Sequence, residues 1–512
     1  MKVNTEIKTL GQLKASGYQS KSVKEEMRQN LVEALKNKKD LFDKIKGYEE
    51  TVIPQMQTAV LSKHNLIFLG LRGQAKTRMA RLMTNLLDEY IPVVEGSEIN
   101  DDPLNPISRY ALDLIQYKGD ETPIGWLHRD NRYTEKLATP DVSVADLIGD
   151  LDPIKAATMK LTYADERVIH FGLIPRSHRG IFVINELPDL QPRIQVALFN
   201  ILQEGDIQIR GFKLRLPLDI EFVFTANPED YTNRGSIITP LKDRIDSQIL
   251  THYPKAIDIS RQITEQEARL SDFQKANIKA PELIKQLVEQ ISFEARKSEY
   301  VDQKSGVSAR LTISAFENMF STAERRMLLS GDTKTFLRIS DILGVIPSIT
   351  GKIELVYEGE LEGISSVAIH LIGKAIRQEF ETLFPNPEKN RKIKKGQEKK
   401  NNLYKEIIDW FNNGNYVDFL QNMSNAEYEL TLKSIPGLEE MVTKVHPMLN
   451  KEEKLLYMEF LLHGLAEYSQ ISKHNLDSGI QFKDLLGSLL NNLGSSNIED
   501  DEAADDLDFR NN

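Results

Sequence analysis

The sequence predicts an α/β fold with a parallel sheet and helices on both of its faces, followed by a mostly helical carboxy-terminal region. In the first half of the chain, helical stretches alternate with short apolar runs at residues 65–70, 91–94, 181–184 and 220–225. This alternation is typical of parallel strands that are joined by helices. From residue 281 onward the hydrophobic periodicity is almost entirely helical.

Length, net charge and amino-acid composition exclude several classes of protein. The 512 residues suffice for about three domains. A net charge of −11 argues against a protein that binds nucleic acid over its whole surface, so we expect no nucleic-acid partner. The absence of cysteine excludes disulfides and thiolate zinc sites and fits a cytoplasmic location. Residues 1–17 lack a signal-peptide core and no apolar run approaches about 18 residues, so we expect no membrane partner.

Helical periodicity marks the segments between the runs. Residues 22–44 are charged and helical in pattern, and apolar residues at helical spacing predict further helices over 76–89 and 191–203. The insertion at 97–145 has no clear period. The apolar stretch at 455–466 is either a core helix or a partner-binding helix, and we favour core.

Three segments interrupt the helical pattern of the second half. Residues 352–360 look like a β-strand, and the basic run at 389–400 is typical of an exposed linker. The acidic residues at 491–512 predict a disordered tail.

The segment "GLRGQAKT" at 70–77 is a candidate phosphate-binding loop, because it follows an apolar strand and leads into a helix. Such loops direct backbone N–H groups at phosphate oxygens, while a lysine neutralises the phosphates and a hydroxyl ligates Mg²⁺. Ala75 stands where a second glycine is usual, and it is tolerable if its φ is negative. The alternative is a chance turn. The candidate binding residues are Gly70, Leu71, Arg72, Gly73, Gln74, Ala75, Lys76 and Thr77.

A second polar site follows the strand "GIFVINEL". It ends in Asn185 and Glu186, where a nucleoside triphosphatase carries an aspartate that holds Mg²⁺ through water and a glutamate that activates the attacking water. The amide of Asn185 accepts hydrogen bonds from metal-bound water but brings no charge, so we expect weakened Mg²⁺ affinity. The alternative for Glu186 is a solvated acid at a strand end.

Three further residues complete the candidate catalytic set. Asn227 follows the third strand, where it could position the same water. Arg244, in "PLKDRID", could stabilise charge on a neighbouring subunit's nucleotide, or it could pair locally with Asp243 or Asp246. Arg310, in "GVSARLT", could reach the γ-phosphate from a lid.

In order and spacing these segments resemble the AAA+ ATPases, and within them the MoxR and magnesium-chelatase I-subunit group. The resemblance covers roughly residues 40–335. It implies that Glu186 is the Walker B glutamate, Asn227 sensor 1, Arg244 the arginine finger and Arg310 sensor 2. Loops of the MoxR type often carry alanine before the lysine, so Ala75 is compatible with a working site.

The same resemblance implies the cofactors. "KGYEETV", with Gly47 and Tyr48, resembles the segment that lies against adenine, and residues 205–219 resemble the pre-sensor hairpin. ATP and Mg²⁺ are the implied cofactors, with Thr77 and Asn185 at the metal. The departure at Asn185 from the family's aspartate predicts slow hydrolysis.

The implied organisation has an N-terminal helical segment and a P-loop AAA+ core, followed by a helical lid, a helical C-terminal region and the tail. The corresponding residue ranges are 1–39, 40–260, 261–335, 336–490 and 491–512. The implied partners are further copies of the chain in a homo-hexameric ring and a protein with a von Willebrand A domain. Three functions stay open: a MoxR-like chaperone, a magnesium-chelatase subunit, and an ATP-dependent transcriptional regulator.

Overall fold

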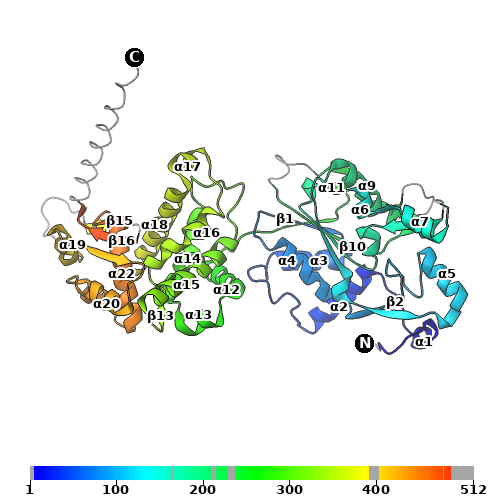
Figure 1. Ribbon diagram of the computed structural model, residues 1–512, viewed down its shortest axis with the longest axis horizontal. Helices are drawn as coiled ribbons and strands as arrows, with labels where there is room; N and C mark the ends of the chain where they lie inside the picture. Colours follow the sequence, from blue (N-terminus) through cyan, green and yellow to red (C-terminus); the bar gives the residue numbers. More distant parts are fainter. Residues whose placement is uncertain are drawn as a thin grey trace, which may run out of the picture. The chain divides into compact units, whose positions relative to one another are not determined.

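The computed structural model describes residues 5–162, 165–209, 215–228, 237–390, 403–476 and 478–485 (Figure 1). The predicted linker at 389–400 lies almost entirely outside the described residues, and the predicted tail at 491–512 lies wholly outside them. The chain divides into two compact units, residues 1–253 and 254–512. The finer division into five segments remains a prediction.

The first unit is built on a five-stranded sheet in the order β11-β1-β10-β7-β4. Each strand pairs with its neighbours in parallel. The predicted runs at 65–70, 181–184 and 220–225 form β1, β7 and β10, with β10 between the other two, so the predicted α/β fold is confirmed. The strands are β1 (Leu66–Leu69), β4 (Tyr133–Leu137), β7 (Gly180–Asn185), β10 (Ile220–Ala226) and β11 (Ser247–Leu250).

Helices cover both faces of this sheet. Leu66 and Phe68 of β1 pack with α2 (Val23–Lys36), α3 (Val52–Leu61) and α4 (Lys76–Leu82). Ile67 and Leu69 point the other way and pack with α9 (Pro192–Glu204). Because successive strand residues face opposite sides and both sides are covered, the central strands consist mostly of apolar residues, which explains their signal in the sequence.

Local sequence sets the ends of the helices. The Ser22 hydroxyl caps α2 by accepting a hydrogen bond from the backbone N–H of Glu25. Helix α9 begins at Pro192 and ends before Gly205, whose φ of 68° is the left-handed conformation that glycine accepts most readily. Helix α4 ends at Leu82 and continues as a 3₁₀ turn, η1 (Met83–Leu86), so it is shorter than the predicted helix at 76–89.

Residues 91–94 form a strand but do not belong to the main parallel sheet, so this part of the prediction was wrong. They belong to β2 (Tyr90–Val94), which pairs antiparallel with β3 (Ile124–His128) in a separate two-stranded ribbon. Its partner lies in the insertion at 97–145, where we saw no period. That insertion also contains α5 (Arg109–Lys118), and it supplies β4, the edge strand of the main sheet.

Smaller elements complete the first unit. Strands β8 (Asp206–Gln208) and β9 (Arg215–Pro217) pair as the predicted hairpin, whose tip at 210–214 lies outside the described residues. A second hairpin joins β5 (Gly149–Leu151) to β6 (Ile169–Phe171). The remaining α-helices described in this unit are α1 (Leu10–Ala15), α6 (Val144–Leu147), α7 (Pro153–Met159), α8 (Leu173–Arg176) and α11 (Thr239–Lys242).

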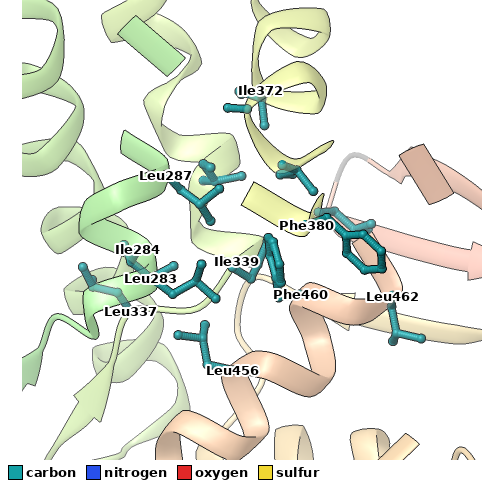
Figure 2. Packing of buried hydrophobic residues seen from close by; sticks show 14 of the residues in the cluster. Leu283, Ile284, Leu287, Leu337, Ile339, Ile372, Phe380, Leu456, Phe460 and Leu462 are labelled. Carbon is teal, nitrogen blue, oxygen red and sulfur yellow. The ribbon is translucent and has the colours of Figure 1, made fainter. Parts of the chain in front are cut away.

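The second unit is mostly helical, as predicted. Figure 2 shows part of its core, where Leu287, Phe380 and Phe460 come from three different helices. The predicted segment at 455–466 lies within α22 and is buried, so it is a core helix. The helices are α12 (Ile257–Glu267), α13 (Asp272–Asn277), α14 (Glu282–Ala295), α15 (Arg310–Ser330), α16 (Ile346–Thr350), α17 (Tyr357–Glu362), α18 (Ile364–Leu383), α19 (Lys405–Asn412), α20 (Asn425–Lys433), α21 (Leu438–Val445) and α22 (Lys451–Glu467).

Two details of the second unit differ from the prediction. The strand-like stretch at 352–360 contributes one isolated bridge, Leu355 to Val301, and then enters α17. An antiparallel sheet in the order β14-β16-β15 was not predicted, because β14 lies far from its partner β16 in the chain and all three strands are too short to interrupt the helical periodicity. Its strands are β14 (Val417–Leu420), β15 (Ser472–Leu476) and β16 (Gly479–Lys483).

Across the residues that the structure describes, no helix combines the length and apolar character needed to cross a membrane.

Candidate functional site

The candidate phosphate loop connects β1 to α4 at the carboxyl edge of the sheet. Gly73 and Ala75 both have a positive φ, of 74° and 57°. The expectation that Ala75 has a negative φ was therefore wrong: this residue is the N-cap of α4, where the chain turns through the left-handed region to enter the helix. For an alanine this conformation costs about 1 kcal/mol.

The side chain of Lys76 folds back over the loop. It is buried, and its ammonium group donates hydrogen bonds to the carbonyl oxygens of Gly70 and Leu71, the latter at 3.2 Å. A buried ammonium group is thus held between the end of β1 and the start of α4. This is where the first N–H groups of a helix lack partners within the helix.

Gly70 is required for close approach. A Cβ atom at this position would overlap the Thr251 hydroxyl and the Gln74 amide oxygen. Those two groups are hydrogen-bonded to each other at 2.7 Å, with Thr251 donating. The segment after β11 therefore holds the loop in place.

Two tyrosine hydroxyls contact backbone carbonyl oxygens of the loop. The Tyr48 hydroxyl lies 2.8 Å from the carbonyl oxygen of Gln74 and 2.9 Å from that of His252, and burial raises the pKa of Tyr48 to about 12. The Tyr253 hydroxyl donates to the carbonyl oxygen of Arg72 at 2.8 Å. Nothing in the sequence marked Tyr253 or Thr251, because their role depends on β11 lying beside β1.

A polar network joins the start of α4 to the ends of β7 and β10. The Asn185 amide oxygen accepts hydrogen bonds from the Thr77 hydroxyl at 3.3 Å and from the Thr225 hydroxyl at 3.1 Å. Asn185 and Thr225 are buried. The Thr225 hydroxyl also accepts from the backbone N–H of Glu186 at 3.2 Å. The fold thus brings together three segments that are far apart in the sequence.

Glu186 and Asn227 lie at the same edge of the sheet. Glu186 follows β7 with a φ of 54°, in the left-handed region, and is partly exposed. Asn227 follows β10, which pairs with β7 in parallel. Their roles in orienting water remain predictions.

The site contains one acidic residue that sequence reasoning missed. The Asn185 amide nitrogen donates to a carboxylate oxygen of Glu135 at 2.7 Å. Glu135 lies on β4, within the stretch where no period was visible. The signal that could have found it is the short alternation in "RYTEKLA", which suits a strand at the edge of the sheet.

Comparison with known proteins supports a family assignment. No protein-family model matches the chain. It is 24% identical over 226 residues to the magnesium-chelatase 38 kDa subunit of Cereibacter sphaeroides, covering 42% of this chain and 60% of that protein. It is 26% identical over 221 residues to the corresponding subunit of Rhodobacter capsulatus, covering 42% and 57%. The chain thus spans less than two thirds of the length of these relatives.

Two solved structures are similar to part of the chain. One chain in a cryo-electron-microscopy structure of the complex between the BchI and BchD subunits of magnesium chelatase matches with a TM-score of 0.33 at 18% identity. The match covers 62% of this protein and 98% of that chain. NtrX from Brucella abortus matches with a TM-score of 0.33 at 13% identity, covering 57% and 55%. The similarity of the chain to the magnesium-chelatase subunits lies in the sequence matches together with the loop, strand order and motifs described above.

The chain is thus similar to AAA+ ATPases of the magnesium-chelatase I-subunit type. By this similarity, the loop at 70–77 is the predicted Walker A segment and the end of β7 the predicted Walker B segment. The individual roles of the residues stay predictions.

Arg244, the predicted arginine finger, makes contacts within its own subunit. Its guanidinium carbon lies 3.9 Å from the centre of the Phe199 ring, and its side chain donates to Gln203 at 3.0 Å and to the carbonyl oxygen of Pro240 at 2.9 Å. Asp243 lies 3.7 Å away and is largely exposed, so this pair adds little. The contacts hold Arg244 against α9.

The other predicted AAA+ positions are Arg310, Gly47 and Tyr48. Arg310 is exposed at the start of α15, in the second unit. Gly47 has a φ of 83° and precedes Tyr48, whose buried hydroxyl supports the loop. Adenine binding by Gly47 and Tyr48 and γ-phosphate sensing by Arg310 remain predictions.

The donor set suits a nucleoside triphosphate with its Mg²⁺. The loop offers a buried ammonium group and the start of a helix, and the Thr77 hydroxyl lies beside the Asn185 amide. Within the described part of the chain, no group of three or more histidine or acidic side chains could hold a metal alone. Lys76 would therefore bind phosphate, while Thr77 and Asn185 would hold an Mg²⁺ that arrives with the nucleotide.

Proposed function

We propose that this protein binds ATP with Mg²⁺ and hydrolyses it slowly to remodel a partner protein. The observation that supports this most strongly is the contact of Thr77 and Thr225 with the Asn185 amide oxygen, beside a loop that buries Lys76. A polar cluster of this kind at the carboxyl ends of parallel strands suits phosphate and metal recognition.

Each residue has one task in this proposal. Lys76 neutralises phosphate charge, and Thr77 ligates the metal. Glu186 orients and activates the attacking water, and Asn227 positions that water. Mg²⁺, when bound, neutralises charge that develops on the phosphates.

The test compares binding with turnover. Lys76→Ala should abolish ATP binding measured by calorimetry, while Lys21→Ala, at an exposed position, should not. Glu186→Gln should retain binding and lose phosphate release, whereas the exposed Glu204→Gln should retain both. If Glu186→Gln hydrolyses ATP as fast as the parent protein, the assignment of the base is wrong.

The partner is proposed from the family. A MoxR-like chaperone that acts with a von Willebrand A protein is our first candidate. A magnesium-chelatase I-type subunit is the second, favoured by the names of the two relatives. No helix-turn-helix pattern favours a transcriptional regulator. A Glu186→Gln variant loaded with ATP should retain its partner. Capture of a von Willebrand A protein would support the chaperone, and capture of porphyrin-pathway enzymes would support the chelatase subunit.

We also propose that the protein assembles as a homo-hexameric ring in which Arg244 reaches the nucleotide of the next subunit. This requires Arg244 to leave its contacts with Phe199 and Gln203. Arg244→Ala subunits keep a working pocket, and Lys76→Ala subunits keep a working arginine. Each should be inactive alone and a mixture should recover part of the activity. A mixture that stays inactive, or an active species that sediments as a monomer, would refute the ring.

A further inference from the structure

We propose that Glu135 supplies the negative charge for the nucleotide's Mg²⁺ that Asn185 does not carry. In this family an aspartate at the position of Asn185 would place a carboxylate beside Thr77. Here the carboxylate stands one side chain further away, on the neighbouring strand β4, 2.7 Å from the Asn185 amide nitrogen. The proposal depends on the ATP site described above.

The first argument concerns the orientation of the Asn185 amide. An ionised carboxylate only accepts hydrogen bonds, so the amide nitrogen of Asn185 must face Glu135. The amide oxygen is thereby turned toward the hydroxyls of Thr77 and Thr225, at 3.3 Å and 3.1 Å. Glu135 therefore fixes which atom of Asn185 faces the candidate metal position.

The second argument concerns how Glu135 is held. Its other oxygen accepts from the Arg81 Nε at 2.9 Å and from the Tyr133 hydroxyl at 3.0 Å. Burial and the Glu135 carboxylate both raise the pKa of Tyr133, so this hydroxyl stays protonated and donates. Together with Asn185, these donors fix both oxygens of the carboxylate at the edge of the site.

The third argument concerns charge. The Arg81 side chain is 64% exposed, whereas that of Glu135 is 23% exposed. An ion pair with a solvated arginine is screened and worth little. The carboxylate therefore remains an effective negative charge toward the more buried side, where Asn185 and Thr77 lie.

The test measures how Mg²⁺ changes ATP affinity, by calorimetry with ATP in EDTA and at a series of Mg²⁺ concentrations. Glu135→Gln should bind ATP in EDTA as the wild type does, but its gain in affinity from Mg²⁺ should fall about 10- to 100-fold, as for other residues that support metal ligands. This readout does not require hydrolysis.

Two variants separate metal binding from structural support. Arg81→Gln removes the ion pair but keeps the carboxylate, so it should retain the wild-type Mg²⁺ dependence. The double variant Glu135→Gln/Asn185→Asp moves the charge to the usual Walker B position and should restore most of the lost dependence. Asn185→Asp alone would place two carboxylates in contact, and it should be less stable than the double variant in thermal unfolding without nucleotide.

The outcomes are distinct. If the wild type binds no ATP, the proposed function fails. If it binds with Mg²⁺ dependence and Glu135→Gln keeps that dependence, Glu135 is not the missing charge. If Arg81→Gln reproduces the loss, Glu135 serves only as a structural ion-pair partner. If Glu135→Gln does not fold, the double variant decides: restored Mg²⁺ dependence supports the proposal, and its absence overturns it.

Discussion

A buried glutamate in the central sheet should make the first unit lose stability as pH rises. Glu221 lies on β10 with both neighbouring strands paired, and it is 2% exposed. Its nearest cation, the Lys24 ammonium, lies 3.9 Å away, and Asp219 and Asp246 add negative charge nearby. Burial is the largest cause that raises the pKa of Glu221 from 4.5 to about 8.

The sign and size follow from linkage. Because the folded unit holds the proton more tightly than the unfolded chain, this contribution to stability is fully present below pH 4.5 and is lost as pH rises through about 8. The free energy of unfolding falls by about 5 kcal/mol over the whole pH range, and about 1.4 kcal/mol of this fall occurs above pH 7. Asp219, whose pKa is raised to about 6, loses its proton almost completely below pH 7. The change in stability above pH 7 therefore reports Glu221.

The assay uses the two tryptophans, Trp126 in the first unit and Trp410 in the second. In a Trp410→Phe background, fluorescence during urea unfolding reports the first unit alone. The free energy of unfolding should fall between pH 7 and pH 9, and Glu221→Gln should remove that fall. Glu33→Gln, at an exposed position on α2, should keep it. If the free energy of unfolding falls with pH equally in Glu221→Gln and in its parent, the reasoning is refuted.

Three further changes test the packing around the site. Gly70→Ala should break the contact of the loop with Thr251 and cost about 1–3 kcal/mol in urea unfolding, together with most ATP affinity in calorimetry. Ala75→Gly should relieve the left-handed alanine and raise the free energy of unfolding by about 0.5 kcal/mol, since the gain of about 1 kcal/mol is partly offset by a more flexible unfolded chain; a loss of stability would contradict the assigned φ. Arg132→Met should lower the free energy of unfolding by about 3–5 kcal/mol in the same urea assay, because it leaves the buried Glu26 carboxylate unpaired. Adding Glu26→Gln should recover much of this loss. If the two substitutions instead lower stability independently and additively, the pairing is contradicted.

The sequence alone determined the elements whose signals are local. Strands β1, β7 and β10 are buried on both faces, so each consists mostly of apolar residues and can be recognised without its partners. The loop at 70–77 was recognisable because its glycines, Lys76 and Thr77 stand at fixed spacing between a strand and a helix. These signals were sufficient to predict the fold class, the loop and the family.

Only the tertiary structure decided what surrounds the loop. Strand β4 is polar because it lies at the edge of the sheet, and Glu135 meets Asn185 although 50 residues separate them. Thr251 reaches Gln74 across 177 residues because β11 pairs with β1. Hydrophobic periodicity records which residues are buried but not which strands pair, so contacts made by strand pairing leave no mark in a single sequence. For the same reason, the positive φ of Ala75 could be seen only in the folded loop, where the start of α4 imposes it.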